Sequence, residues 1–263
     1  MPYTTIQTRR EDSVGSITFN RPDIHNAFNS TVISELSAAF TEMEKDRSVR
    51  VVVLTGAGNS FCAGADLNWM RGVISQSFDE NLGESNALAD LFWQIYSFKR
   101  PVIGRINGAA IGGGTGFVAV CDIAISSQSA VFSFSEVKIG VVPACIGPYV
   151  VKKMGEGKAR ELFITGERMN AQRAHEVGLV NKVVGDEQLD AEVNALIDSL
   201  LSSGPEAVAM AKRLVSGVGG MTPEQFRPWT ADMIAKLRVS PEGQEGMDAF
   251  LNKRKPNWVK KKS

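Results

Sequence analysis

The chain has 263 residues, of which 43% are hydrophobic and 22% are charged, as in an ordinary folded globular protein. Its 29 basic and 29 acidic side chains balance, so no overall positive field attracts nucleic acid. The length suits one domain of roughly 250 residues, or one domain with an appendage.

The cysteines and histidines limit the chemistry that side chains can offer. Cys62, Cys121 and Cys145 lie far apart and form no CxxC pair, which favours a reducing compartment over a disulfide framework. Because neither Cys nor His residues are paired at a ligand spacing, we expect no metal site. We find no signal-peptide pattern and no apolar run that approaches ~20 residues, so we expect a cytoplasmic protein without a membrane or nucleic-acid partner.

The first part of the chain alternates predicted strands with predicted helices. Residues 13–19 alternate in polarity, which is typical of a strand. Residues 30–46 carry apolar side chains at helical spacing, with Ser30 as the expected N-cap. A β-branched run over residues 49–55 predicts a strand that is covered on both faces. Residues 67–98 then read as mostly helical, with an irregular centre.

The rest of the chain is organised around a glycine-rich turn at residues 107–117. An apolar strand over residues 102–106 enters this turn, and a helix is expected to leave it. Because glycine has no β-carbon, backbone N–H groups here can approach a ligand closely, and the first N–H groups of a helix have no partner within it. The turn therefore either binds an anion or a developing oxyanion, or packs a helix closely on a sheet. Both interpretations remain open at this point.

A second turn of small residues, 58–67, also follows a buried strand and precedes a helix. Parallel strands end at one edge of a sheet, so the two turns can aim N–H groups at one point, as an oxyanion hole requires.

Glu136 is a lone acid in an apolar stretch, residues 132–143. If it is buried, its pKa should rise, which suits proton transfer near neutral pH. Alternatively, Glu136 is a surface glutamate that pairs with Lys138.

The second half of the chain is mainly helical. Strands alternating with helices before it predict a mainly parallel α/β sheet. A break near residues 184–188 predicts a boundary between an α/β part, 1–187, and a helical part, 188–263. Helices are predicted at residues 157–164, 171–177, 189–202, 206–217, 223–239 and 242–253.

Taken together, the motifs resemble the enoyl-CoA hydratase/isomerase (crotonase) family, in order and over nearly the whole chain. Asn68-Trp69-Met70 and residues 146–150 narrow the resemblance to hydratases of the methylglutaconyl- and carboxygeranyl-CoA type. The family motifs are carried by residues 61–67, Asn107-Gly108 with Gly112-Gly113-Gly114, Cys121-Asp122, Ser135-Glu136 with Gly140 and Pro143, Asn20-Arg21-Pro22 and Glu245-Gly246-Met247.

The resemblance implies a fold, an assembly and a set of site residues. The fold would be a spiral of repeated ββα units with a helical C-terminal trimerisation region, assembled as a homotrimer or a hexamer. The substrate would be an acyl-CoA thioester, so no separate cofactor is expected. Backbone N–H groups of Ala65 and Gly113 would form the oxyanion hole, with Glu136 as the acid–base residue. The residues along the CoA would be Ala27, Phe28, Ala63, Asp66 and Leu67, together with Lys253 of a neighbouring subunit.

One position departs from the family pattern. Hydratases of the family usually carry two glutamates, and the first would fall at Gly116. A single Glu136 permits isomerisation readily, whereas hydration requires it to return the proton that it takes. We expect Gly116 to leave a small space that holds an acyl branch, a water or a carboxylate from elsewhere. The candidate carboxylates are Glu80, Glu84 and Asp90.

Three functions are compatible with this pattern. The preferred hypothesis is a hydratase that adds water to a branched or functionalised 2-enoyl-CoA. One alternative is an enoyl-CoA isomerase that uses Glu136 alone. The other is a CoA-ester-binding or RNA-binding protein without turnover, although the chain shows no aromatic and basic stripe for RNA.

Overall fold

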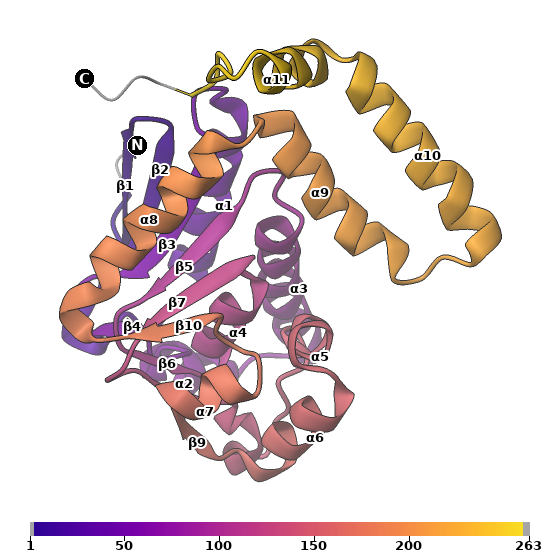
Figure 1. Ribbon diagram of the computed structural model, residues 1–263. Helices are drawn as coiled ribbons and strands as arrows, with labels where there is room; N and C mark the ends of the chain where they lie inside the picture. Colours follow the sequence, from indigo (N-terminus) through magenta and orange to yellow (C-terminus); the bar gives the residue numbers. More distant parts are fainter. Residues whose placement is uncertain (1–2, 260–263) are drawn as a thin grey trace. The chain divides into compact units, whose positions relative to one another are not determined.

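The computed structural model describes residues 3–259 (Figure 1). The chain divides into two compact units, Met1–Phe98 with Val102–Asn194 and Lys99–Pro101 with Ala195–Ser263. This division falls within helix α8 (Leu189–Ser202), whereas the boundary expected from the sequence, between residues 187 and 188, falls just before that helix.

The first unit contains a six-stranded sheet. Its outer pair, β1 and β2, is an antiparallel hairpin, and the other neighbours are parallel. Asp12 and Ser13 turn the hairpin with φ angles of 45° and 75°, the signs that a type I′ turn requires. The strands lie in the order β1 (Ile6–Glu11), β2 (Val14–Phe19), β3 (Val51–Gly56), β5 (Val102–Ile106), β7 (Ile123–Ser127) and β10 (Lys182–Val184).

A second, four-stranded sheet is built from short strands. Each of β4, β6 and β8 follows directly on a strand of the first sheet, and helices come next in the chain. This order gives the repeated ββα units that the resemblance implies. The strands lie in the order β4 (Ser60–Cys62), β6 (Ala109–Ile111), β8 (Val131–Ser133) and β9 (Arg168–Asn170).

Most helices lie at the predicted positions, but α5 (Gly147–Met154) was not predicted. The first helix begins at Ser30, but its N-cap is Asn29, whose side chain accepts from the N–H of Val32, so the expected cap is wrong by one residue. The segment 67–98 forms two helices, and Ser77 caps the second one. The helices of the first unit are α1 (Ser30–Lys45), α2 (Leu67–Val73), α3 (Phe78–Tyr96), α4 (Gly113–Val120), α5 (Gly147–Met154), α6 (Glu156–Thr165) and α7 (Ala171–Glu176), with 3-10 turns η1 (Pro22–Ile24), η2 (Ser135–Ile139) and η3 (Asp186–Gln188).

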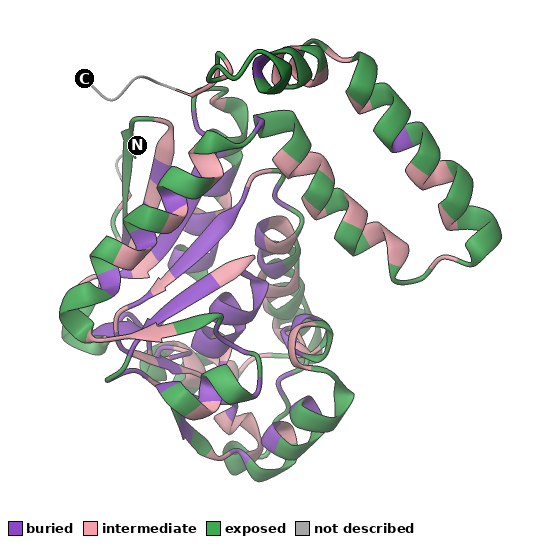
Figure 2. Cartoon of the chain, in the orientation of Figure 1, coloured by how far each residue is buried: buried purple, intermediate pink, exposed green. Residues whose placement is uncertain are grey.

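The core of the first unit surrounds α4. Phe117 of this helix lies 4.8 Å from the ring of Phe92, 5.2 Å from that of Phe19 and 5.7 Å from that of Phe28, measured between centroids. Figure 2 shows buried residues along β3, β5 and β7 and on α4. The helix that begins at the glycine turn is therefore fixed by the main hydrophobic core.

The second unit is helical, with α9 (Pro205–Val218), α10 (Pro223–Val239) and α11 (Pro241–Leu251). Glu242 accepts hydrogen bonds from the N–H groups of Glu206 and Ala207 at the start of α9, at 2.9 and 2.8 Å. No helix within residues 3–259 is both long enough and apolar enough to cross a lipid bilayer.

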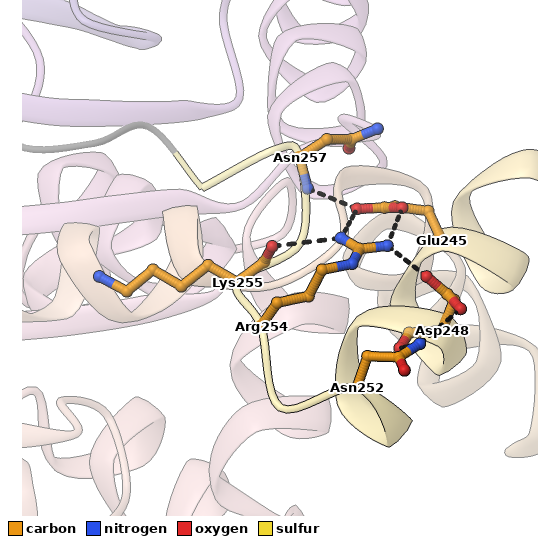
Figure 3. Close-up of polar contacts among 6 residues, drawn as sticks. All are labelled: Glu245, Asp248, Asn252, Arg254, Lys255 and Asn257. Carbon is orange, nitrogen blue, oxygen red and sulfur yellow. Dashed lines mark hydrogen bonds and ion pairs between the residues drawn. The ribbon is translucent and has the colours of Figure 1, made fainter.

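Beyond α11 the chain is tied back to that helix by Arg254 (Figure 3). Its guanidinium binds both carboxylate oxygens of Glu245, at 2.7 and 2.8 Å, and Asp248 at 2.6 Å. The N–H of Asn257 adds a 2.7 Å bond to Glu245. The hydrogen bonds from Arg254 and Asn257 lower the pKa of Glu245 to about 2. This bidentate geometry gives the end of the described chain a defined conformation.

Candidate active site

The two glycine turns lie against each other in the first unit. Strands β4 and β6 pair in parallel, which places the segments that follow them side by side. Gly64 has a φ of 95°, and a β-carbon there would lie 2.7 Å from the carbonyl oxygen of Ile111. A β-carbon at Gly114 would overlap the carbonyl oxygen of Cys62. Glycine is thus required at both positions by the close approach of the two backbones.

The first turn leaves the N–H of Ala65 available. Ala65 forms a parallel bridge with Phe28, in which Phe28 N–H donates to Gly64 and Asp66 N–H donates to Phe28, both at 2.8 Å. Successive groups of an extended chain point to opposite sides, so the N–H of Ala65 points away from this bridge. Within residues 3–259 it has no hydrogen-bond acceptor.

The second turn presents the N–H of Gly113. The N–H groups of Thr115 and Gly116 both bond to the carbonyl of Gly112, and Gly112 N–H bonds to Ser133. Gly113 is the first residue of α4, and its N–H finds no acceptor in the described part of the chain. Such N–H groups carry the partial positive charge of the helix dipole.

Phe28 joins the two turns. It bridges to Ala65, and a β-carbon at Gly113 would lie 2.7 Å from its ring. Both predicted oxyanion donors therefore adjoin one residue, although their role stays a prediction. The Phe28 side chain is only 2% exposed and packs 5.8 Å from the ring of Trp69, so it supports the turns from inside the protein.

Asp66 is also held within the protein, through a partner that the sequence did not suggest. Its Oδ2 accepts from Arg21 Nη2 at 2.7 Å, and its Oδ1 caps α2 by accepting from Asn68 N–H at 2.8 Å. Burial acts to raise the pKa of Asp66, but these hydrogen bonds and the Arg21 charge outweigh it and lower the pKa. Arg21 Nη1 also donates to the carbonyl of Ala27 at 2.6 Å. Arg21 thereby ties the segment before Phe28 to the first turn.

The other predicted CoA residues differ in exposure. Leu67 is 69% exposed at the start of α2, Ala63 is partly exposed, and Ala27 is buried. Lys253 is exposed just after α11 in the second unit, with a φ of 52°. Contact of these residues with CoA stays a prediction.

Glu136 lies beside the start of α4. Pairing of β6 with β8, which matches Ile111 with Ser133, brings η2 next to the glycine turn. A β-carbon at Gly112 would lie 3.2 Å from Glu136 Oε1. Glu136 Oε2 is buried, and no hydrogen-bond partner for it exists among the described residues. The alternative, an ion pair between Glu136 and Lys138, does not occur within residues 3–259.

The protonation of Glu136 follows from this environment. Burial raises the pKa of the carboxyl above its ordinary value, and a hydrogen bond that it accepts from its own backbone N–H acts to lower it. An unpartnered buried oxygen is costly unless a ligand or a proton satisfies it. Glu136 is therefore suited to take up and release a proton next to the two N–H groups.

The expected space at Gly116 does not exist, and this prediction is corrected. A β-carbon at Gly116 would overlap Cγ2 of Ile146 and would lie 3.1 Å from Cζ of Phe92. Both side chains are buried. The space of a β-carbon at Gly116 is thus filled by the protein's own core, and the small space expected directly beside this residue is absent.

The acidic residues expected as substitutes lie in other surroundings, and two of them have other hydrogen-bond partners. Glu80 accepts from the N–H and hydroxyl of Ser77, at 2.8 and 2.7 Å, and so caps α3. Glu84 accepts from Trp69 Nε1 at 2.9 Å. Asp90 lines a groove of about 980 Å³ whose walls include α1 and α3. None of the three is shown beside Glu136, and within residues 3–259 no His, Cys, Asp and Glu cluster can hold a metal ion.

Cys62 lies beneath the glycine turn that starts α4. Its side chain is fully buried, and burial raises the pKa of the thiol to about 12, although a hydrogen bond from Gly64 acts to lower it. Cys62 packs under Gly114, where a β-carbon would lie 3.3 Å from the Cys62 Cβ.

Comparisons with known proteins match nearly the whole chain. The family described as enoyl-CoA hydratase/isomerase matches residues 9–261. A crotonyl-CoA hydratase of Syntrophomonas wolfei is 34% identical over 99% of this chain and 100% of its own length. The crystal structure of an enoyl-CoA hydratase from Shewanella pealeana has a TM-score of 0.94 at 38% identity and covers 97% of this chain and 96% of that chain. A structure from Legionella pneumophila described as an enoyl-CoA hydratase/isomerase (crotonase) has a TM-score of 0.90 at 43% identity, over 97% of this chain and 99% of that one.

Proposed function

The chain belongs to the enoyl-CoA hydratase/isomerase family of enzymes and has the crotonase fold, and we propose that it adds water to a 2-enoyl-CoA thioester. One observation carries this proposal. The buried oxygen of Glu136 has no partner among the described residues, and the carboxylate adjoins the N-terminal turn of α4. A proton-transfer group is thus placed next to donors that can hold an oxyanion.

In the proposed reaction the thioester carbonyl oxygen accepts hydrogen bonds from the N–H groups of Ala65 and Gly113. Attack at C3 of the enoyl group moves negative charge onto this oxygen. Donors fixed in place before the reaction stabilise that charge without reorganisation. The dipole of α4 acts in the same direction, because Gly113 is its first residue.

Glu136 performs both proton transfers. Its carboxylate takes a proton from water as the water oxygen bonds to C3, and the electrons of the double bond move to form the enolate. The resulting carboxylic acid returns the proton to C2 as the carbonyl re-forms. The raised pKa of Glu136 supports this double role, because the group must be able to hold the proton between the two steps.

A second candidate is isomerisation, and the packing at Gly116 favours it. Gly116 carries no carboxylate, and Ile146 and Phe92 fill the space of a β-carbon beside it, so this position gives Glu136 no acidic partner. In an isomerase, Glu136 takes a proton from one carbon of the acyl chain and returns it two carbons away while the double bond moves. This reaction needs no water.

For the acyl chain we propose a branched or functionalised group. This rests on the resemblance of residues 68–70 and 146–150 to branched-chain hydratases. Trp69 and Met70 of this stretch are partly exposed on α2, directly after the first turn.

For the assembly we propose a homotrimer, or a hexamer of two trimers, in which Lys253 contacts the CoA of a neighbouring subunit. Large apolar side chains of the second unit, such as Val215, Val239 and Phe250, are more than three-quarters exposed in the single chain. In the proposed assembly, association buries part of this surface. Sedimentation velocity at working concentration should give a trimer or larger, and a monomer would contradict both proposals.

The reaction is tested by incubating the protein with saturated, 2-enoyl and 3-enoyl CoA thioesters and following their masses. Hydration adds the mass of one water to the 2-enoyl ester. Isomerisation leaves the mass unchanged but moves the double bond, which chromatography resolves. Glu136→Gln is the control for both reactions. If every ester stays unchanged, the proposed enzyme function is wrong and binding alone remains.

A further inference from the structure

Helix α4 begins at Gly113 of the proposed oxyanion site, and a lysine from the neighbouring helix α5 contacts its other end. Lys153 belongs to the last turn of α5, and its Nζ donates to the carbonyl oxygen of Cys121 at 2.6 Å and to that of Val118 at 3.5 Å. These carbonyls belong to the end of α4 and the residue that caps it. Neither contact involves the residues that the proposed mechanism uses.

The last carbonyl groups of a helix have no partner within it, and the dipole gives them negative charge. An ammonium at this end satisfies the carbonyls and complements the dipole. Since α4 has only eight residues, its two ends are roughly 12 Å apart. Because α4 is so short, a shift of its C-terminal end after a change at Lys153 should also move Gly113 at its other end.

Helix α5, which carries Lys153, contacts α4 at a second place. Ile146, the N-cap of α5, packs its Cγ2 against Gly116 so closely that a β-carbon there would overlap it. Lys153 follows at the other end of α5. The two contacts hold α4 near its first turn and at its last carbonyls, and both come from one neighbour.

We propose that Lys153 is a positioning residue for the oxyanion site: it fixes the C-terminal end of α4 and thereby the direction and field of the Gly113 N–H. The proposal rests on the function proposed above, because it assigns a purpose to that N–H. Three influences act on the ammonium itself. Burial lowers the pKa of Lys153, and the electrostatic effects of Cys121 and Asp122 act in the opposite direction.

The chain provides a matched control. Lys152 is the preceding residue, carries the same charge and is exposed, with its Nζ 5.3 Å above the ring of Tyr96. Lys152→Met and Lys153→Met remove the same charge and add the same side chain, but only the second change affects the carbonyls of α4. Lys153→Arg keeps a cationic donor in place. If Lys153→Met does not fold, Lys153→Gln serves for the same comparison.

Two measurements separate positioning from simple stability. The first is the split of kcat and KM with a 2-enoyl-CoA. The second is the absorption of bound 4-(dimethylamino)cinnamoyl-CoA, whose band moves to longer wavelength as its carbonyl oxygen is polarised. This binding signal requires no turnover.

Lys153→Met should lower kcat about tenfold with little change in KM, the scale expected for a partly buried charge at a helix end, and should reduce the spectral shift. Lys153→Arg should restore both, and Lys152→Met should change neither. A folded Lys153→Met protein with wild-type kcat and spectral shift overturns the proposal, even if it melts earlier. If the wild type polarises the thioester but converts none, the proposed function fails and this inference stands. If the wild type does not polarise it, both fail.

Discussion

Glu136 and Gly116 both lie close to the first turns of α4, yet their surroundings differ. Glu136 places one carboxylate oxygen next to Gly112 and buries the other without a partner in the described chain. Gly116 is enclosed by Ile146 and Phe92 so tightly that it has no room for a β-carbon. Glu136 thus has an unsatisfied hydrogen-bonding oxygen, whereas Gly116 is closely packed on all sides that a side chain would need.

This difference indicates that proton transfer is possible at Glu136 and not at Gly116. A buried carboxylate oxygen without a partner is unfavourable for folding, so it is retained where function requires it. A close-packed glycine contributes to stability and offers no group to a reaction. The four predictions below test the contrast in order of expected effect.

The largest effect should come from Glu136→Gln. The amide keeps the shape of the carboxyl group but cannot take up a proton, so kcat should fall by ~10²–10⁴. Steady-state kinetics with the substrate found in the mass assay measures the loss. Glu84→Gln is the matched control, since it keeps an acceptor for Trp69 Nε1 and should react at the wild-type rate. Full activity in Glu136→Gln would place the proton chemistry elsewhere.

Gly113→Pro should follow, with a loss of ~10²–10³ in kcat, the usual result of removing an oxyanion donor. Proline suits the first position of a helix, so α4 can still form. Gly113→Ala is the control for shape, because it places a β-carbon 2.7 Å from the Phe28 ring position but keeps the N–H. If the two variants lose activity equally, crowding rather than donor loss is the cause.

The packed side of the comparison is tested through stability. Gly116→Glu should destabilise the protein by at least about 1–3 kcal/mol, because it overpacks the core, and should not increase hydration of a straight-chain substrate. Adding Ile146→Gly should then cost less than the ~2–5 kcal/mol usual for deleting a buried isoleucine, since it removes the contact that Gly116→Glu overpacks. Gly83→Glu on α3 is the control, because a β-carbon there has no neighbour within 4 Å. Urea unfolding measures all four proteins, and a stable Gly116→Glu single variant would show that the space exists after all.

The smallest effect should be a pH dependence of stability. The folded pKa of Glu136 is raised above its unfolded value, so the folded state binds the proton more tightly. Its contribution to stability is complete at low pH and is lost as the pH rises through the window above the ordinary glutamate pKa. Glu136→Gln mimics the neutral form, so its stability relative to wild type should be higher at pH 7 than at pH 4. A difference that does not vary with pH in urea unfolding would contradict the assigned environment.

Part of this fold could be predicted from local pattern. Strand β2 follows from alternating polarity, β3 from a continuous β-branched run, and most helices from apolar residues that repeat every 3.6 positions. Strands β4, β6, β8 and β9 have three residues each, too few to show a period. Their presence was implied only by the family resemblance, which supplied the ββα repeat.

The site also has features that local sequence motifs predict and features that depend on residues far apart in the sequence. Ala65, Gly113 and Glu136 belong to motifs that are contiguous in sequence, and the structure places all three around one pair of turns. The filling of Gly116 depends on Ile146, which lies in another helix, and no local pattern reports such a contact. The bond between Arg21 and Asp66 spans 45 positions and was missed for the same reason.

The burial of the Cys62 thiol beneath the turns affects how the enzyme reacts with electrophiles. An α,β-unsaturated thioester is an electrophile, and a nearby thiolate can add to its C3 carbon. Cys62 lies under the turn next to the proposed site, but burial raises the pKa of its thiol to about 12, which disfavours the reactive thiolate at pH 7. Iodoacetamide should therefore leave Cys62 unmodified until the protein is unfolded, as mass spectrometry of the labelled peptides can check. The packing that fixes the oxyanion helix also protects the protein from alkylation by its own substrate.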